Sequence, residues 1–465
     1  MNFLIVLASL SFLMFVAYRG YSVILFAPVA AMGAVLLIEP TLVAPMYSGL
    51  FMAKMVEFVK NYFPVFLLGA VFGKVIELSG FSKSIVAWVI GLIGRDRAML
   101  AIVLVCAILT YGGISLFVVV FAVYPFAAEM FRQSDIPKRL IPGTIALGAF
   151  TFTMDALPGT PQIQNIIPTT FFKTNIYAAP WLGIIGATFI LITGLSYLEW
   201  QRRKALKLQE GYGTNLLNEP EPFEHEKLAH PAIAILPLIM VGVMNKVFTV
   251  AIPYFYGESI SFIPAVIGDP APVVVQTKAI AAVWAVVGAL LTGIATVFVF
   301  AGRTVVAKFA AGSRTAIAGA LLATMNTASE YGFGAVIAAL PGFLIIANAL
   351  SAIPNPLINQ AVTVSALAGI TGSASGGMGI ALAAMADTFI ENAHAAGIPL
   401  EVLHRVASMA SGGMDTLPHN GAVITLLAVT GLTHRQSYKD IFAITCIKTL
   451  AVFVIIGVYY ATGIV

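Results

Sequence analysis

Apolar segments long enough to cross a bilayer recur from one end of the chain to the other. A spanning helix needs roughly 20 apolar residues. The one long polar stretch, 201–230, combines mixed charge with several prolines, which is typical of a linker. The pattern predicts spans at about 2–18, 21–38, 58–79, 138–172, 180–200, 231–255, 275–302, 325–350, 399–432 and 437–463. We therefore expect an all-α integral membrane protein.

Composition supports this class and removes several others. The chain is 59% hydrophobic and 10% charged, whereas soluble domains contain about 25% charged residues. The net charge of +4 is spread over short loops, so no nucleic-acid partner is expected. No nucleotide-binding loop or metal-ligand spacing is present, which argues against an ATP-driven pump, a fixed metal and any other cofactor. The first apolar segment begins at Asn2 without a preceding basic region, so we interpret it as a retained span.

A short string occurs twice in apolar surroundings. Residues 154–158 (MDALP) return as 414–418 (MDTLP), which separates Asp155 from Asp415 by 260 residues. Other landmarks follow in the same order at offsets of 260 to 264. They are Phe72 and Phe333, Gly112 and Gly376, Glu129 and Glu391, and Ile136 and Ile398. The series indicates an internal duplication, with halves at 1–200 and 231–465 joined by the polar linker 201–230.

The basic residues predict that the two halves are inverted. Positively charged loops lie on the cytoplasmic side of membrane proteins, and most basic loops fall on one side if both termini are outside. This requires re-entrant helical hairpins at 97–130 and 355–393. Each half then has five spanning helices, an odd number, and one of the five is broken by proline, at 138–172 and 399–432. Inverted repeats of this kind are the usual plan of secondary transporters. The exceptions to the charge rule are Lys54, Lys60 and Lys173.

The hairpin tips and helix breaks are the predicted binding site. Lipid cannot satisfy free backbone groups, so broken helices at membrane depth line cavities or pack on protein. Freed carbonyls can hold a cation, and amides at a helix start can hold a carboxylate. We expect these amides, hydroxyls and His419, and no Arg or Lys, to hold a small monocarboxylate. The candidate substrate ligands are Thr110, Gly112, Gly113, Ser115, Pro158, Gly159, Thr160, Gln162, Asn165, Thr371, Ser373, Ser375, Gly376, Gly377, Pro418, His419 and Asn420.

Asp155, Asp415, Glu330 and His419 are the candidate carriers of the coupling ion or proton. An ionisable side chain at bilayer depth costs roughly 2.5–3.5 kcal/mol on insertion scales, so such residues call for a function. Less specific interpretations remain for each group. The aspartates can cap half-helices, and His419 can be an ordinary interior histidine. Glu330 can pair with Lys74 or lie at an interface. The tip glycines can be helix-packing contacts, and the linker can be a solvated connector or a regulatory contact.

These strings resemble the gluconate:proton symporter (GntP) family of the ion transporter superfamily. The resemblance covers about 58–200 and 320–463 and is carried by 111–113 (YGG), 157–161 (LPGTP) and 412–420 (GGMDTLPHN). It implies two inverted repeats, each with a re-entrant hairpin and a broken helix, a homodimer and an elevator-like motion. Gluconate-type members carry different strings at both breaks. The chain looks closer to permeases for short hydroxy acids of the 3-hydroxybutyrate type.

We therefore expect a symporter in a bacterial-type cytoplasmic (inner) membrane, which imports a small organic carboxylate such as a sugar acid or short hydroxy acid with protons. Sodium coupling, with Na⁺ at the hairpin tips, is the nearest alternative because carbonyls and hydroxyls suit sodium equally well. A passive channel is less consistent with duplication inside one chain. An intramembrane enzyme would need the two aspartates to act as a dyad. We expect a transporter rather than an enzyme.

Overall fold

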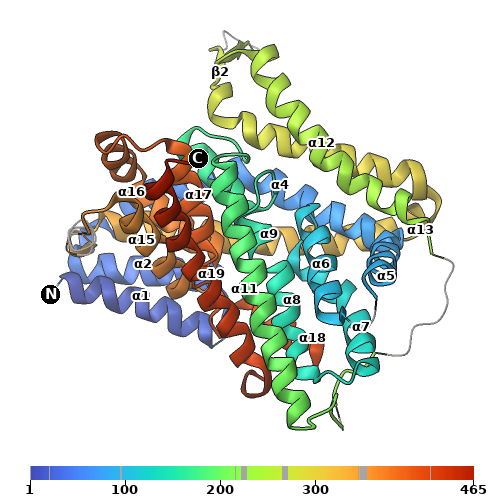
Figure 1. Cartoon of the computed structure of the whole chain (residues 1–465). Coiled ribbons are helices and arrows are strands. Elements are labelled where there is room, and N and C mark those ends of the chain that lie inside the picture. The colour runs from blue at the N-terminus through green and yellow to red at the C-terminus, as the bar shows by residue number, and fades with distance from the viewer. Residues whose placement is uncertain are drawn as a thin grey trace.

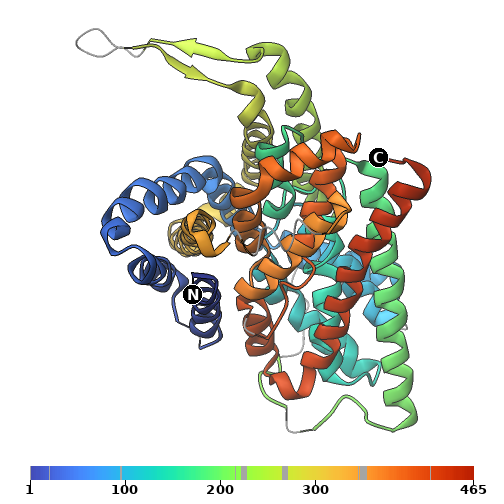
Figure 2. The ribbon, with the colours of Figure 1, turned by 90° about the vertical axis from the view of Figure 1, so that its left-hand side faces the viewer.

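The computed structural model describes residues 2–19, 21–94, 97–214, 216–220, 228–263, 271–343, 345, 353–418 and 420–465. These residues are almost entirely helical, as predicted. Five helical segments are long and apolar enough to cross a membrane: Pro40–Leu78, Pro180–Lys207, Pro231–Tyr256, Thr277–Ala339 and His434–Thr462. The exception to the helical prediction is a small antiparallel sheet of β1 (Ile260–Phe262) and β2 (Val273–Val275). This hairpin projects from the helical body (Figure 2).

Long helices form one side of the molecule. The chain begins with α1 (Asn2–Tyr18) and α2 (Val23–Ile38), then passes through η1 (Pro40–Leu42), α3 (Val43–Met46) and η2 (Tyr47–Phe51) into α4 (Met52–Leu78). Later in the sequence come α12 (Pro231–Tyr256) and α13 (Thr277–Ala339). Helix α13 packs against α2, α4 and α12, and Figure 2 shows the N-terminal helices curving around it. The predicted broken helices and the helices at the C-terminal end of the chain lie beside this layer (Figure 1).

Helix α13 follows the prediction in part. The hydrophobic pattern predicts separate spans at 275–302 and 325–350, and α13 consists of two helices that meet at a kink at Ala301 (φ −133°, ψ 20°), near the end of the first predicted span. The second helix begins directly after this kink and so includes the segment that the pattern leaves between the two spans. The segment between the predicted spans contains charged residues but no proline to end a helix. The end of the second predicted span, 344 and 346–350, lies outside the described residues.

Helix α5 (Phe81–Ile93) was not predicted as an element. It has 13 residues, which at 1.5 Å per residue is about 20 Å and too short to cross a bilayer. The chain enters it through Gly80, whose φ of +75° is easily adopted by glycine. A search for spanning segments therefore passes over it.

Two antiparallel helix pairs occupy the predicted hairpins. The first consists of α6 (Ala98–Tyr111) and α7 (Leu116–Gln133), and the second of α15 (Pro356–Thr371) and α16 (Ala374–Ala395). The second turn is shorter than predicted, because Ser373 accepts a hydrogen bond from the amide of Gly376 (3.1 Å) and starts α16 at Ala374. Ser375, Gly376 and Gly377 therefore lie in the first turn of a helix and not in the tip loop.

Both predicted helix breaks are present. The first segment contains η4 (Lys138–Leu140), α8 (Ile141–Ala149), α9 (Phe152–Asp155) and α10 (Ile163–Phe172). The second contains α17 (Leu400–Ser411) and α18 (Gly421–Thr430). We call residues 154–165, from the end of α9 to the first turn of α10, break one, and residues 412–418 and 420 break two. Helices α11 (Pro180–Lys207) and α19 (His434–Thr462) follow the breaks and lie side by side (Figures 1 and 2).

The described part of the linker is held against the helices. Glu210 accepts hydrogen bonds from Arg139 (2.6 Å), and Glu219 forms an ion pair with buried Lys138 (2.7 Å). Between them, Asn218 donates to the carbonyl of Ala428 at the end of α18 (2.8 Å). This segment is thus attached to both halves of the chain, although most of its described residues are exposed.

Candidate functional site

Break one contacts the tip of the first helix pair. The hydroxyl of Tyr111 donates to the carbonyl of Pro158 (2.8 Å), and Gln162 donates to the carbonyl of Thr110 (2.7 Å). Gly159 has φ +84°, and a Cβ there would lie 2.7 Å from the ring of Tyr177. The turn therefore requires glycine for both its backbone conformation and its close neighbours.

The other polar residues of break one hold its own backbone. Thr160 donates to the carbonyl of Thr153 (2.8 Å). The Asn165 amide donates to the carbonyls of Thr160 (3.0 Å) and Ile176 (2.8 Å). Because lipid offers no such partners, these bonds stabilise a non-helical segment among helices. Their role as substrate ligands remains a prediction.

Two buried side chains of α17 clamp break one from the other half of the chain. The guanidinium of Arg405 donates to the carbonyls of Asp155 (3.0 Å) and Ala178 (2.7 Å) and to the side-chain oxygen of Asn165 (3.1 Å). His404 contacts the same Asn165 oxygen through Nε2 (3.1 Å). Both side chains are fully buried. Arg405, a charged residue inside a predicted span, thus holds the backbone of break one, and the expectation that no Arg or Lys holds the substrate stays a prediction.

The two repeated aspartates come together in the interior. Asp155 is 2% exposed, and its carboxylate lies so close to Gly412 that a Cβ would not fit there. Asp415 forms an ion pair with Lys448 of α19. Asp155 lies within electrostatic range of both Asp415 and Lys448. Among the described residues, Oδ1 of Asp155 has no hydrogen-bond partner, so the two acids differ in how their charge is balanced.

Break two contacts the tip of the second helix pair through Asn420. Its side chain accepts from the amide of Val423 (2.9 Å), which caps α18, and donates to the carbonyl of Gly372 (2.8 Å). The residue at the N-cap of α10 is Gln162. These caps replace the predicted alternative in which the aspartates cap the half-helices. In the same break, the carbonyl of Pro418 contacts Nε2 of His434 (2.9 Å). His419 lies outside the described residues.

Glu330 is a residue of α13, and its side chain lies beside the start of α16. Its carboxylate interacts with Ser373 and lies against Gly376 so closely that a Cβ would not fit. It is 4% exposed, and its Oε2 has no hydrogen-bond partner in the described part of the chain. Lys74 instead pairs with Glu77 (2.7 Å). The alternative of a Glu330–Lys74 pair is therefore not what the structure contains, and Glu330 faces the positive end of a helix.

Several predicted glycines pack against other elements. A Cβ on Gly112 would lie 2.5 Å from the side chain of Leu238, and one on Gly377 would overlap the backbone of Ala368. Gly113 has φ +94°. Packing is thus a sufficient reason for Gly112 and Gly377, as the alternative interpretation proposes.

The remaining tip residues differ in their bonding. Thr110 is fully buried, and its Oγ1 has no partner among the described residues. Thr371 donates to the carbonyl of Leu367 (3.0 Å). Ser115 is the residue that precedes α7, and Ser375 contacts Thr327 (3.3 Å).

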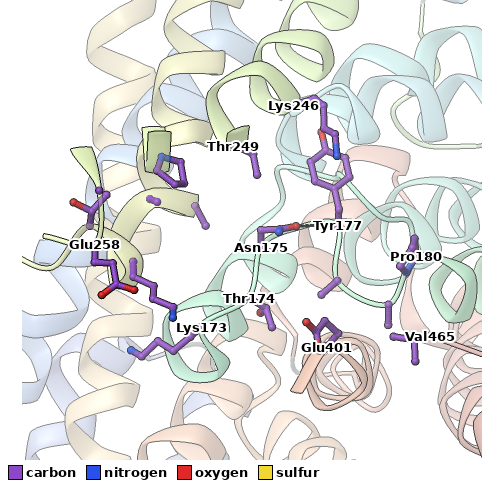
Figure 3. A pocket seen from close by; sticks show the side chains of 18 residues that line it. Lys173, Thr174, Asn175, Tyr177, Pro180, Lys246, Thr249, Glu258, Glu401 and Val465 are labelled. Carbon is purple, nitrogen blue, oxygen red and sulfur yellow. Dashed lines mark hydrogen bonds between the residues drawn. The ribbon is translucent and has the colours of Figure 1, made fainter. Parts of the chain in front are cut away.

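A pocket of about 750 Å³ opens beside the loop that follows α10 (Figure 3). Lys173, Lys246 and Lys278 contribute to its wall, and Lys246 lies 4.6 Å from the ring centroid of Tyr177. Thr174 belongs to the same wall and contacts Nδ1 of His404 (2.7 Å). The pocket thus reaches the side chains that clamp break one. It was not predicted, because its lysines come from distant parts of the sequence.

Comparisons with known proteins identify transporters. The chain is 58% identical to the uncharacterized transporter YxjC of Bacillus subtilis (strain 168), and the alignment covers all of both proteins. No family model matches the chain.

Two solved structures are similar in fold. The YdaH transporter of Alcanivorax borkumensis is 14% identical over 89% of this chain and 88% of its own, with a TM-score of 0.52. MtrF of Neisseria gonorrhoeae, described within a class of antimetabolite efflux pumps, is 15% identical over 87% of this chain and 82% of its own, with a TM-score of 0.52. At this identity the similarity extends to the fold alone.

Proposed function

This chain belongs to the same family as the transporter YxjC of Bacillus subtilis, and on that premise we propose that it is a secondary symporter for a small organic monocarboxylate and protons. It is a multi-pass membrane transporter and not an enzyme. The substrate, the coupling ion and the architecture of the transport cycle are the parts that we propose.

The observation that carries the proposal is the buried carboxylate of Asp155. It lies where break one meets the C-terminal end of α17, and its Oδ1 has no partner among the described residues. A carboxylate at membrane depth is costly unless it is paired or protonated. An acid in this position can take up a proton when it is open to one side and release it on the other. We assign a second such role to Glu330, whose Oε2 is also without a described partner.

An anionic substrate fits the surroundings of break one. Lys173, Lys246 and Lys278 line the pocket beside it. Two acids, Glu258 and Glu401, also belong to the wall, so the basic residues outnumber the acidic ones. The guanidinium of Arg405 lies behind the pocket wall. Positive groups around a cleft raise the local concentration of anions. A pocket of about 750 Å³ has room for a small hydroxy acid of the 3-hydroxybutyrate type, and a sugar acid such as gluconate is the alternative.

The architecture that we propose follows the internal duplication. Residues 1–200 and 231–465 are inverted repeats, the pairs α6–α7 and α15–α16 are re-entrant, and both termini face outward from a bacterial inner membrane. The repeated string at both breaks supports this arrangement. Membership of the gluconate:proton symporter family, a homodimer and an elevator-like motion are further parts of the proposal.

Sodium coupling is the second candidate. Oγ1 of buried Thr110 has no described partner at the tip of the first helix pair, and hydroxyl oxygens suit a sodium ion. The two candidates differ in which gradient drives uptake. For either ion, an added membrane potential contributes about 2.3 kcal/mol per charge per 100 mV.

The decisive experiment is uptake of labelled 3-hydroxybutyrate and gluconate into proteoliposomes. We expect accumulation under an inward proton gradient without sodium, no accumulation under a sodium gradient alone, and loss of proton-driven uptake in Asp155→Asn. Asp387→Asn, which changes an exposed acid of α16, is the matched control and should transport normally. Uptake that never exceeds equilibrium would indicate a channel, and a response to sodium alone would support the second candidate.

A further inference from the structure

Lys448 connects the two breaks through a single ammonium group. It lies on α19 and is 2% exposed. Its Nζ donates to the carbonyl of Phe150 (3.1 Å) and forms an ion pair with Asp415. Phe150 is the residue at the C-terminal end of α8, where the chain turns into the short helix α9 that leads to break one, and Asp415 lies in break two. One side chain therefore supplies a positive charge to both halves.

The groups around this ammonium are those that hold free cations in secondary transporters. Carbonyls at the C-terminal ends of half-helices carry the negative end of the helix dipole and coordinate sodium ions or protons. A carboxylate beside such a carbonyl completes an oxygen site for a cation. In this protein the two oxygen groups, the carbonyl of Phe150 and the carboxylate of Asp415, contact Nζ of Lys448 instead of a free cation.

The duplication does not extend to this lysine. At the offsets of 260 to 264 that relate the two halves, the counterpart of Lys448 falls within residues 184–188 (IIGAT), which contain no basic residue. A lysine retained for packing or symmetry would have an equivalent in α11. The charge is instead present once, between the two breaks.

We infer that Lys448 is a tethered cation that occupies the position of a free sodium ion between the breaks and so makes this position independent of sodium. The inference rests on the proposed function and deepens it, because it assigns the ion preference of the symporter to one residue. Lys448 acts on Asp415 and on the end of α8, and through them on the geometry of both breaks.

The test measures thermal unfolding of the purified protein in sodium chloride and in choline chloride at equal ionic strength. We expect no difference for the unaltered protein. Lys448→Ala leaves the oxygen ligands and an open space, so sodium should raise its melting temperature by about 2 °C or more. Lys448→Met fills the space with an uncharged chain and should show no response. Lys246→Ala, which changes a lysine of the pocket wall, is the matched control and should also show none.

Each outcome decides the inference. A folded Lys448→Ala variant without a sodium response overturns it, as does a sodium response of the unaltered protein. If Lys448→Ala cannot be purified, Lys448→Ser gives the same measurement, because it also leaves the oxygen ligands and an open space, and a folded Lys448→Ser variant without a sodium response overturns the inference. Thermal unfolding needs no transported substrate. A failure of the proposed function, seen as absent proton-driven uptake, is therefore distinguishable from a failure of the lysine assignment.

Discussion

Break one and break two carry the same repeated string but balance its acid in different ways. In break two, Asp415 is paired with Lys448. In break one, Oδ1 of Asp155 has no hydrogen-bond partner among the described residues, and the nearby guanidinium of Arg405 bonds to backbone carbonyls and Asn165. A duplicated sequence has thus acquired one neutralised acid and one available acid. We propose that this difference separates a structural role of Asp415 from a transport role of Asp155.

The helices that follow the two breaks are also held differently. Helix α18 is capped by Asn420 and contacts the linker through Ala428. Helix α10 has Gln162 at its N-cap, without a side-chain cap bond, and is followed by the loop that borders the pocket. The helix after the second break is therefore capped and attached to the linker, whereas the helix after the first break has no side-chain cap bond and leads to the pocket. The predictions below test this contrast.

The largest effect on stability should come from neutralising the paired acid. Asp415→Asn leaves the ammonium of Lys448 buried without its counter-charge, and breaking one partner of a buried ion pair costs about 3–5 kcal/mol. Asp155→Asn removes no ion pair and should change the free energy of unfolding by less than about 1 kcal/mol. Denaturant unfolding in detergent measures both. Equal losses for the two variants would contradict the contrast between the breaks.

The breaks could be predicted from sequence because their causes are local. Prolines, glycines and one acid within an apolar segment identify both positions, and the helices end there as expected. The partners could not be predicted in the same way. Whether Arg405 or Lys448 reaches a given break depends on which helices pack together, and the offsets of the repeat do not contain that information. The helical conformation of 303–324, directly after the kink of α13 at Ala301, was missed because charged residues between two apolar stretches look like a loop.

The next effect should come from the clamp on break one. Arg405→Lys retains the positive charge but loses the planar group that bonds to Asp155, Asn165 and Ala178 together. Hydrogen bonds to charged groups contribute about 1.5–3 kcal/mol each, and a lysine can replace only some of them. We expect a loss of about 2–4 kcal/mol in unfolding experiments. A neutral result would mean that break one holds its shape without the guanidinium.

A smaller effect should follow from removing the cap of break two. Asn420→Ala loses the bond to the amide of Val423 and the bond to the carbonyl of Gly372. N-cap replacement by alanine typically costs about 1 kcal/mol, and the lost tip contact adds to it. Gln162→Ala, which loses only the contact to the first tip, is the matched variant and should cost less. The unfolding midpoints of the two variants measure these losses. A larger loss in Gln162→Ala than in Asn420→Ala would contradict the contrast between the two breaks.

The smallest effect should be the pH response of the linker that holds α18. Burial works to raise the pKa of Glu219, but hydrogen bonds from Lys138 and Arg132 outweigh it, and the pKa lies below its ordinary value. A group with a lowered pKa in the folded state stabilises at neutral pH, and this contribution is lost as the pH falls below about 4.5.

Because Glu219 is partly exposed, we expect its ionised form to contribute less than about 1 kcal/mol to the stability of the linker contacts. Hydrogen exchange of residues 209–214 and 216–220 should be faster at pH 4 than at pH 7 after correction for intrinsic rates, and Glu219→Gln should reduce that difference. A variant with the same pH response as the unaltered protein would show that another group holds the linker on α18. The linker would then contribute less to holding α18, the helix after break two, than we propose.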